Sequence, residues 1–385
     1  MQGFSLDTYL KELEGIVNID SGSRNVVGIG KVADYFTQRF EAMGWRVTRH
    51  IFREDIGPTI EIRNSDAENI DILMIGHMDT VFVDGTASKR PFNVADGKAY
   101  GPGALDMKSG LMNALYICEA LNKTAELDLN ICVVMNGDEE ISSTCSQFLI
   151  TELAKKSSCC FVMESGRDGD RMVNKRKGLA KYVVEFFGKP AHAGVAPQDG
   201  ASAIHEMANW VVQLVKLNQY EIGTSLNVGF VSGGTVPNVV AERARIEIDT
   251  RFELIEEQQK IERTLTYLEK NITVDGVSAE WSVLGNRPPM NPTKETETLM
   301  AIVNAAGDRV GYKVAGFVAT GGGSDANFTA AAGCPSLDGM GPSGEGAHGN
   351  SEWFDISKVE PRIDLMIEVL NTLSANKKAN GAISL

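Results

Sequence analysis

Three consecutive acids follow an apolar run in the segment ICVVMNGDEEISS (131–143). Five apolar residues are followed, after an Asn-Gly pair, by Asp138, Glu139 and Glu140. A solvated loop is the commoner explanation of such a cluster. Carboxylates held together are also the groups that bind divalent cations and transfer protons. Other polar residues at the ends of apolar strands decide between the two interpretations.

Four further segments carry a histidine or an acid in a suggestive position. In LMIGHMDTVF (73–82), His77 and Asp79 are two residues apart, so both side chains project from one face of an extended strand. Such a pair can combine a metal ligand with an acid that orients a ligand. Asp106 follows a Gly-Pro-Gly turn before a predicted helix, where an acid is commonly an N-cap. Glu164 ends another apolar run, and His348 lies among glycines.

Taken together, these positions indicate a shared metal site. In open α/β sheets, ligands bind at the carboxyl ends of the strands, and His77, the acids 138–140 and Glu164 each follow a predicted strand. Two histidines with aspartate and glutamate, and no thiolate, form a nitrogen and oxygen ligand set that suits zinc, manganese or cobalt. The sequence therefore predicts a metal site at this edge of a sheet.

Strands and helices alternate through most of the chain. Expected helices cover 6–17, 28–43, 108–122, 142–156, 294–310 and 357–374, and expected strands cover 45–53, 58–63, 70–76, 129–135 and 160–164. This order predicts an α/β fold with a mixed, largely parallel sheet flanked by helices.

A smaller α+β domain is expected between Gly178 and the Pro-rich segment NRPPMNP. Residues 179–188 and 241–252 alternate apolar and polar side chains, as half-exposed antiparallel strands do, and helices are expected at 199–218 and 254–270. We therefore assign residues 178–288 to an inserted domain. Residues 1–177 and 289–385 then form the larger domain.

Composition excludes several classes of protein. With 51 acids and 37 bases, the net charge of −14 disfavours a nucleic-acid surface. No apolar run approaches the roughly 18 residues of a membrane span. The six cysteines fit no C-x-x-C zinc pattern, which indicates reduced thiols, and the N-terminal residues do not resemble a signal peptide. We expect a cytoplasmic protein.

Seven segments, in order, resemble the signatures of the co-catalytic zinc peptidase family. They are GHMDTVF, GPGALDMKSG, NGDEE, MESG, GKPAHAG, GGTVPNVVAERARIEIDTR and TGGGSDA. The family includes bacterial glutamate carboxypeptidase, to which the likeness is strongest, as well as aminoacylases, succinyl-diaminopimelate desuccinylase and tripeptide aminopeptidase.

The resemblance implies a site with two Zn²⁺ ions per subunit, with Mn²⁺ or Co²⁺ as possible substitutes. Asp106 would bridge the ions, Glu139 would be the general base, and Asp79 would orient His77. The remaining ligands would be His77 and Glu164 for one ion, and Glu140 and His348 for the other. A hydroxide between the ions would then attack an amide carbonyl.

The resemblance also assigns residues that contact substrate. His192 would stabilise the oxyanion in the partner subunit of a homodimer formed through the inserted domain. Asn238 and Arg251 would bind a substrate carboxylate, and Arg171 would be a further contact. Without the resemblance, His192 would be interpreted as a structural loop histidine, and Arg251 as a residue on the solvated face of a strand.

The expected function is hydrolysis of an amide or peptide bond next to a free carboxylate, in a small peptide or an N-acyl amino acid. Alternatives within the family are an N-acyl-amino-acid deacylase and a di- or tripeptidase, and an alternative of another class is a catalytically silent metal or peptide binder. GIGKVA (28–33) gives only weak support for a dinucleotide site, and TGGGSDANF (320–328) is no P-loop. His50 and His205 are interpreted as structural.

Overall fold

A computed structural model of the chain describes residues 4–123 and 128–385. The chain divides into two compact units. The α/β unit comprises residues 1–175, 291–320 and 324–385, and the inserted unit comprises residues 176–290 with 321–323. Each unit has its own cluster of buried apolar side chains.

The main sheet of the α/β unit is mixed and largely parallel, as predicted. Its strands, in spatial order, are β1 (Arg46–His50), β2 (Thr59–Arg63), β6 (Ile131–Asn136), β3 (Ile70–His77), β7 (Ser157–Val162) and β15 (Ser336–Leu337). β3 pairs in parallel with β6 and β7, and β15 is parallel to β7, whereas β1, β2 and β6 pair antiparallel. Every residue of β3 and β6 is buried, which is typical of a parallel core covered on both faces.

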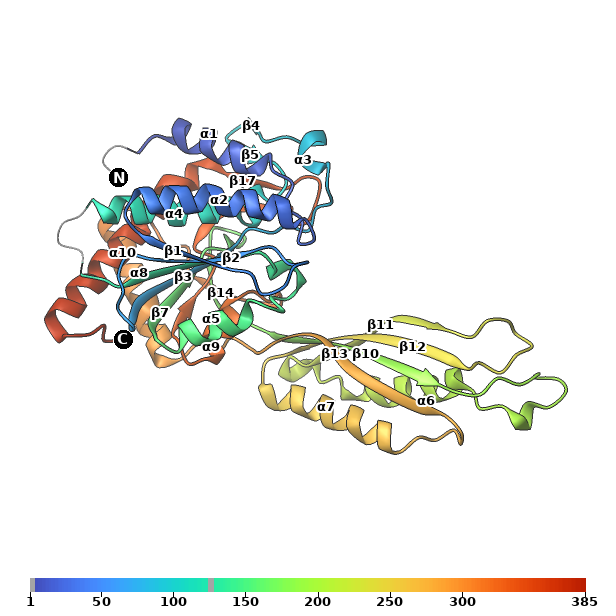
Figure 1. Ribbon diagram of the computed structural model, residues 1–385. Helices are drawn as coiled ribbons and strands as arrows, with labels where there is room; N and C mark the ends of the chain where they lie inside the picture. Colours follow the sequence, from blue (N-terminus) through green and yellow to red (C-terminus); the bar gives the residue numbers. More distant parts are fainter. Residues whose placement is uncertain (1–3, 124–127) are drawn as a thin grey trace. The chain divides into compact units, whose positions relative to one another are not determined.

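Helices cover both faces of this sheet (Figure 1). On one face, α2 (Val26–Ala42) packs against β1 and β2, and α4 (Ser109–Asn122) packs against β3. On the other face, α5 (Gln147–Ala154) and α9 (Ala326–Ala331) pack against β7. The unit also contains α1 (Leu6–Val17), α3 (Thr86–Lys89), α8 (Lys294–Val310) and α10 (Val359–Asn380). The glycines of GIGKVA lie within α2 rather than in a strand-to-helix loop, which agrees with the weak support that the sequence offered for a dinucleotide site.

The helix predicted over residues 142–156 is shorter than expected. A 3₁₀ turn occupies Glu139–Ile141, and Ser142 and Ser143 have positive φ angles of 73° and 48°, which an α-helix does not allow. α5 therefore begins only at Gln147.

A second, five-stranded sheet was not predicted. In spatial order it contains β4 (Asn93–Ala95), β5 (Lys98–Tyr100), β17 (Trp353–Asp355), β16 (Gly341–Glu345) and β8 (Ser165–Gly166). β8 follows Glu164 directly, the loop between β16 and β17 carries His348, and the segment after β5 carries Asp106. This sheet therefore ties three candidate ligand segments together. A two-stranded pair of β9 (Met172–Arg176) and β14 (Phe317–Thr320) completes the strands outside the inserted sheet.

The inserted unit is a four-stranded antiparallel sheet with two helices. Its order is β11 (Ser225–Gly233), β12 (Arg243–Phe252), β10 (Gly178–Phe187) and β13 (Ser278–Arg287). Side chains of β12 alternate between buried and half-exposed, which confirms the antiparallel interpretation of 241–252. α6 (Ala203–Leu214) and α7 (Ile255–Lys270) contribute apolar side chains to the core of the unit. α6 begins after Ser202, whose hydroxyl caps the first turn, and not at residue 199.

Among the helices within 4–123 and 128–385, none combines the length and the apolar character that crossing a membrane requires.

Candidate metal centre

Parallel strands bring the predicted ligands to one edge of the main sheet. His77 is the last residue of β3, and Glu164 follows β7 by two residues. Glu139 and Glu140 lie in the 3₁₀ turn just beyond β6. Since β6, β3 and β7 run in the same direction side by side, their carboxyl ends meet.

The first group of ligand atoms comes from His77, Asp106 and Glu164, whose donor atoms lie within 4.8 Å of one another. His77 Nε2 is 3.1 Å from Asp106 Oδ1 and 3.5 Å from Glu164 Oε1. The imidazole of His77 is 1% exposed and the carboxylate of Glu164 is 9% exposed. This group is therefore nearly closed to solvent.

The second group shares Asp106 with the first. His348 Nε2 is 3.1 Å from Asp106 Oδ2 and 3.3 Å from Glu140 Oε2. The two oxygens of the Asp106 carboxylate thus face different histidines. A carboxylate that faces one ligand group with each oxygen is arranged to bridge two cations.

Both groups fit divalent metal ions. Two ligand atoms about 2.0–2.1 Å from one tetrahedral zinc ion lie about 3.3 Å apart, and the separations above are 3.1–3.5 Å. Glu140 Oε1 is buried and accepts no hydrogen bond within the described residues, although a buried carboxylate oxygen without a partner is costly. A metal ion would satisfy that oxygen.

The pKa shifts indicate a strongly negative local field. Hydrogen bonds with Asp106 and Glu140 raise the pKa of His348 to about 10. Burial opposes the charged form of His77, but its hydrogen bonds with Asp106 and two further carboxylates outweigh burial and raise its pKa. Burial likewise opposes the charged form of Asp106, but its hydrogen bonds with both histidines lower its pKa. A field that holds protons on two imidazoles also attracts divalent cations.

Asp79 connects the first histidine to the acidic turn. Its carboxylate accepts hydrogen bonds from the amides of Glu139 and Glu140, both at 3.1 Å, and from the Ser23 hydroxyl at 2.7 Å. His77 Nδ1 is 2.9 Å from the carbonyl oxygen of Asp79, which leaves Nε2 to face the ligand group. Asp79 therefore contacts both His77 and the turn that carries Glu140.

Asp138, the first acid of the cluster, is not at the ligand groups. It is fully buried, and its carboxylate accepts hydrogen bonds from the amides of Cys145 and Ser146 and from the Ser146 hydroxyl. Burial raises its pKa. Asp138 thus fixes the backbone that follows the 3₁₀ turn, and the three acids have three different environments.

Glu352 is a site residue that the sequence interpretation missed. It is completely buried and accepts hydrogen bonds from the amides of Gly103, Leu105 and Asp106 at 3.0, 2.9 and 3.0 Å. Burial raises its pKa to about 7 although these amides lower it. Glu352 is four residues beyond His348, so it holds the loop of one ligand to the loop of another. The sequence did offer a hint of this role, because Glu352 lies in GEGAHGNSEWFDIS, the segment that carries His348, next to Trp353 and Phe354.

The predicted substrate contacts lie mostly in the inserted unit. His192 and Asn238 are exposed and adjacent, since the Ala193 amide donates to the Asn238 carbonyl. Arg251, on β12, donates to both carboxylate oxygens of Asp249 at 2.9 and 3.0 Å, so an ion pair occupies the guanidinium. In the α/β unit, Arg171 donates to the carbonyl of Asp168 in its own loop.

The two histidines interpreted as structural have local contacts. His50 Nε2 is 3.0 Å from Glu61 Oε2 on the neighbouring strand, and His205 is an exposed residue in the first turn of α6.

Comparisons with known proteins identify the family of this chain. Residues 73–372 match the model of peptidase family M20/M25/M40. The chain is 29% identical to carboxypeptidase G2 of a Pseudomonas species over 378 residues, which cover 96% of this chain and 90% of that protein. It is 27% identical to succinyl-diaminopimelate desuccinylase of Albidiferax ferrireducens, over 80% of this chain and 82% of that protein.

Solved structures show the same fold. The crystal structure of a tripeptidase from Staphylococcus aureus aligns with a TM-score of 0.75 at 22% identity, covering 96% of this chain and 99% of that one. A metallo-carboxypeptidase of the M20 family from Sulfolobus solfataricus aligns with a TM-score of 0.74 at 18% identity, over 94% and 98% of the two chains.

Proposed function

Since the chain belongs to peptidase family M20/M25/M40 and is a metallopeptidase or amidohydrolase, we propose that it is a dizinc enzyme that cleaves an amide bond next to a free carboxylate. The observation that carries this proposal is the sharing of Asp106 by two ligand groups. His77 and Glu164 complete one group, and Glu140 and His348 complete the other.

Bound in these groups, two divalent ions would act as Lewis acids on the amide carbonyl and lower the pKa of a nearby water. The ligand chemistry suits zinc, and manganese or cobalt would fit the same donors. Glu139 precedes the ligand Glu140 in the same turn, and Asp79 fixes the amides of both. We assign Glu139 as the base that accepts a proton from the attacking water and delivers it to the leaving amine.

The inserted unit would supply the rest of the site. We propose that residues 178–288 form the lid and dimerisation domain, that residues 1–177 and 289–385 form the catalytic domain, and that the enzyme is a homodimer. His192 would stabilise the oxyanion, and Asn238 and Arg251 would bind the substrate carboxylate. Arg251 must release Asp249 to do so, and a carboxylate offers the same bidentate geometry as that partner. Arg171 remains a proposed further contact.

The names of similar proteins support the proposed substrate class. A carboxypeptidase, a deacylase of succinylated diaminopimelate and a tripeptidase are among the similar proteins. A glutamate-type carboxypeptidase is our first candidate, and an N-acyl-amino-acid deacylase or a di- or tripeptidase shares the same chemistry. All six cysteines are free thiols, which supports a reducing, cytoplasmic location.

Replacement of Glu139 by Gln tests the role of the base. We expect turnover of N-acyl glutamates and dipeptides to fall about 10²–10⁴-fold, because the proton acceptor is lost, while elemental analysis still finds two metal ions per chain. Glu152→Gln is the control, since Glu152 is an exposed acid on α5. Loss of metal would identify Glu139 as a ligand. Wild-type protein that binds metal but hydrolyses no member of the panel would be the silent binder.

A further inference from the structure

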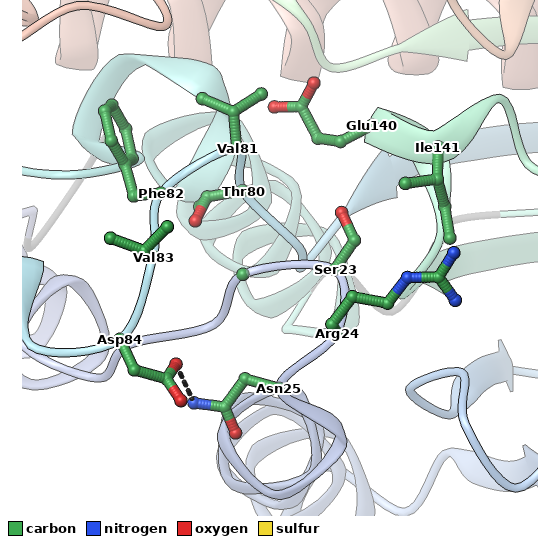
Figure 2. Close-up of a pocket in the computed structure, with 11 residues that line it drawn as sticks. Ser23, Arg24, Asn25, Thr80, Val81, Phe82, Val83, Asp84, Glu140 and Ile141 are labelled. Atoms are coloured by element: carbon green, nitrogen blue, oxygen red, sulfur yellow. Dashed lines mark hydrogen bonds between the residues drawn. The ribbon is translucent and has the colours of Figure 1, made fainter. Parts of the chain in front are cut away.

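A cavity of about 500 Å³ in the α/β unit has Glu140, a residue of the second ligand group, in its lining (Figure 2). Three segments line it: 22–25, 80–84 and the pair Glu140 and Ile141. Its volume falls within the range of about 300–1,000 Å³ that is usual for small-molecule sites. If Glu140 holds a metal ion as proposed, a group bound in this cavity would lie next to that ion.

The cavity is fixed relative to the metal ligands. The Ser23 amide donates to the Thr80 carbonyl at 3.2 Å, and the Thr80 amide donates to the Ser21 carbonyl at 2.9 Å. The Ser23 hydroxyl donates to Asp79, the same carboxylate that holds the amides of Glu139 and Glu140. The wall formed by Ser23 is thus positioned by the network that positions the metal-binding turn.

One part of the lining is apolar and unusually exposed. Val81 is 41% exposed and Val83 is 78% exposed, and Ile141 lies on the opposite side of the cavity in Figure 2. These side chains suit a short hydrocarbon group, whose burial contributes about 0.8 kcal/mol per CH₂.

Arg24 gives the cavity a positive charge that one partner does not fully satisfy. Arg53 binds both carboxylate oxygens of Asp55, at 2.5 and 2.8 Å, whereas Arg24 makes one contact with Asp55 at 3.2 Å. Two guanidinium groups therefore share one carboxylate. The hydrogen bond with Arg53 is the main cause of the lowered pKa of Asp55, and Arg24 contributes a smaller Coulomb interaction. Exposed pairs of this kind contribute little, so Arg24 can exchange Asp55 for another anion.

The other charged side chains of the lining, Asp84 and Glu140, are acids, so Arg24 is the position that can bind an anion. Asp84 accepts a hydrogen bond from the Asn25 side chain at 2.7 Å, on the side of the cavity away from Ile141. Glu140 is assigned to a metal ion. The proposed function already gives the carboxylate of the leaving amino acid its own contacts, so we assign this cavity to the acyl side of the amide.

We propose that the cavity binds an acyl group with a short apolar stem and a terminal carboxylate, with the stem against Val81, Val83 and Ile141 and the carboxylate on Arg24. The proposal rests on the proposed amide hydrolysis and specifies its acyl substrate class.

Two substrates of matched length test it: N-glutaryl-L-glutamate and N-pentanoyl-L-glutamate, which differ in a terminal carboxylate or methyl group. We expect the wild-type kcat/KM to favour the glutaryl compound. Arg24→Glu should lower the ratio of the two values at least about tenfold, as loss of a hydrogen bond to a charged group does, mainly through the glutaryl value. Asp55→Asn, which releases Arg24, should raise the ratio. Arg46→Glu is the control, because Arg46 is an exposed arginine paired with Asp66 outside the cavity.

Equilibrium binding of both compounds to zinc-loaded Glu139→Gln protein, measured by calorimetry, separates this inference from the proposed function. If wild-type protein hydrolyses neither compound nor any other N-acyl glutamate or dipeptide, but adding Arg24→Glu to the Glu139→Gln protein weakens binding of the glutaryl compound alone, the proposed function fails and the cavity assignment stands. If both compounds are hydrolysed and Arg24→Glu leaves the ratio of their kcat/KM values unchanged, the cavity assignment fails and the proposed function stands. Preference of the wild type for the pentanoyl compound, or binding of neither, overturns the assignment.

Discussion

The two ligand groups of the candidate metal centre differ in how the chain holds them. His77 is the last residue of a fully buried strand, it is 1% exposed, and its second ring nitrogen faces the Asp79 carbonyl. His348 is 56% exposed and lies in a loop where its own φ is +64°. Asp106 is common to both groups.

This difference predicts two metal positions of unequal affinity. Residues buried in a parallel core open only with much of the fold, whereas exposed loops open at low cost in free energy. The first group is therefore pre-organised, and the second depends on a loop that must be held in place. We expect an ion in the second group to exchange faster and to be removed first by a chelator.

The largest effect should come from Asp106, because it is the residue that the two groups share. Asp106→Ala should leave less than one zinc ion per chain by elemental analysis. Its loss of activity should exceed the roughly 10- to 100-fold that is typical when only an outer hydrogen-bond partner of a metal ligand is removed. Asp66→Ala, at an exposed position, is the matched control. Retention of one full equivalent of zinc would show that the groups are independent.

The ligands of the first group could be predicted from the sequence more readily than the sheet and the side chain that hold the second group in place. His77 and Glu164 follow long apolar runs, and such runs predict buried parallel strands whose ends meet. The five-stranded sheet that carries the His348 loop is built from strands of two to five residues. Strands this short show no clear periodicity. Glu352 was missed because its partners are backbone amides nearly 250 positions away.

In contrast to the contacts of Glu352, the ion pair between Arg251 and Asp249 could have been predicted from the sequence. Asp249 and Arg251 are two residues apart on a strand, so their side chains share one face. The 3₁₀ turn at Glu139–Ile141 was not accessible in this way, because the bonds that fix it come from Asp79 on a different strand end.

The next largest effect should separate the two histidines. His348→Ala should retain about one zinc ion per chain, because His77, Asp106 and Glu164 remain in place around the first group. His77→Ala removes a buried ligand, leaves unpaired carboxylates and should reduce zinc binding at both positions. Stepwise titration with a chelator, followed by elemental analysis, measures the two affinities. If His348→Ala and His77→Ala lose the same amount of zinc, the two ligand groups do not differ in affinity as predicted.

The smallest of the three effects should come from Glu352, which accepts hydrogen bonds from the backbone amides of Gly103, Leu105 and Asp106 and holds this segment through its backbone. Glu352→Gln keeps the shape of the side chain but replaces one accepting oxygen with an NH₂ group, which must face an amide donor. The loop of Asp106 and the loop of His348 then lose part of their connection, while His77 and Glu164 keep their strand positions. Metal affinity should fall about 10- to 100-fold, more at the second group than at the first.

Competition with a chelator measures both affinities, and thermal unfolding of the metal-free protein reports any general loss of stability. Glu345→Gln, at an exposed acid on β16 of the same sheet, is the matched control. A purely structural role for Glu352 would lower the unfolding temperature and leave the ratio of the two metal affinities unchanged. A change in that ratio without a change in unfolding temperature would identify Glu352 as the residue that positions the looser half of the centre against the rigid one.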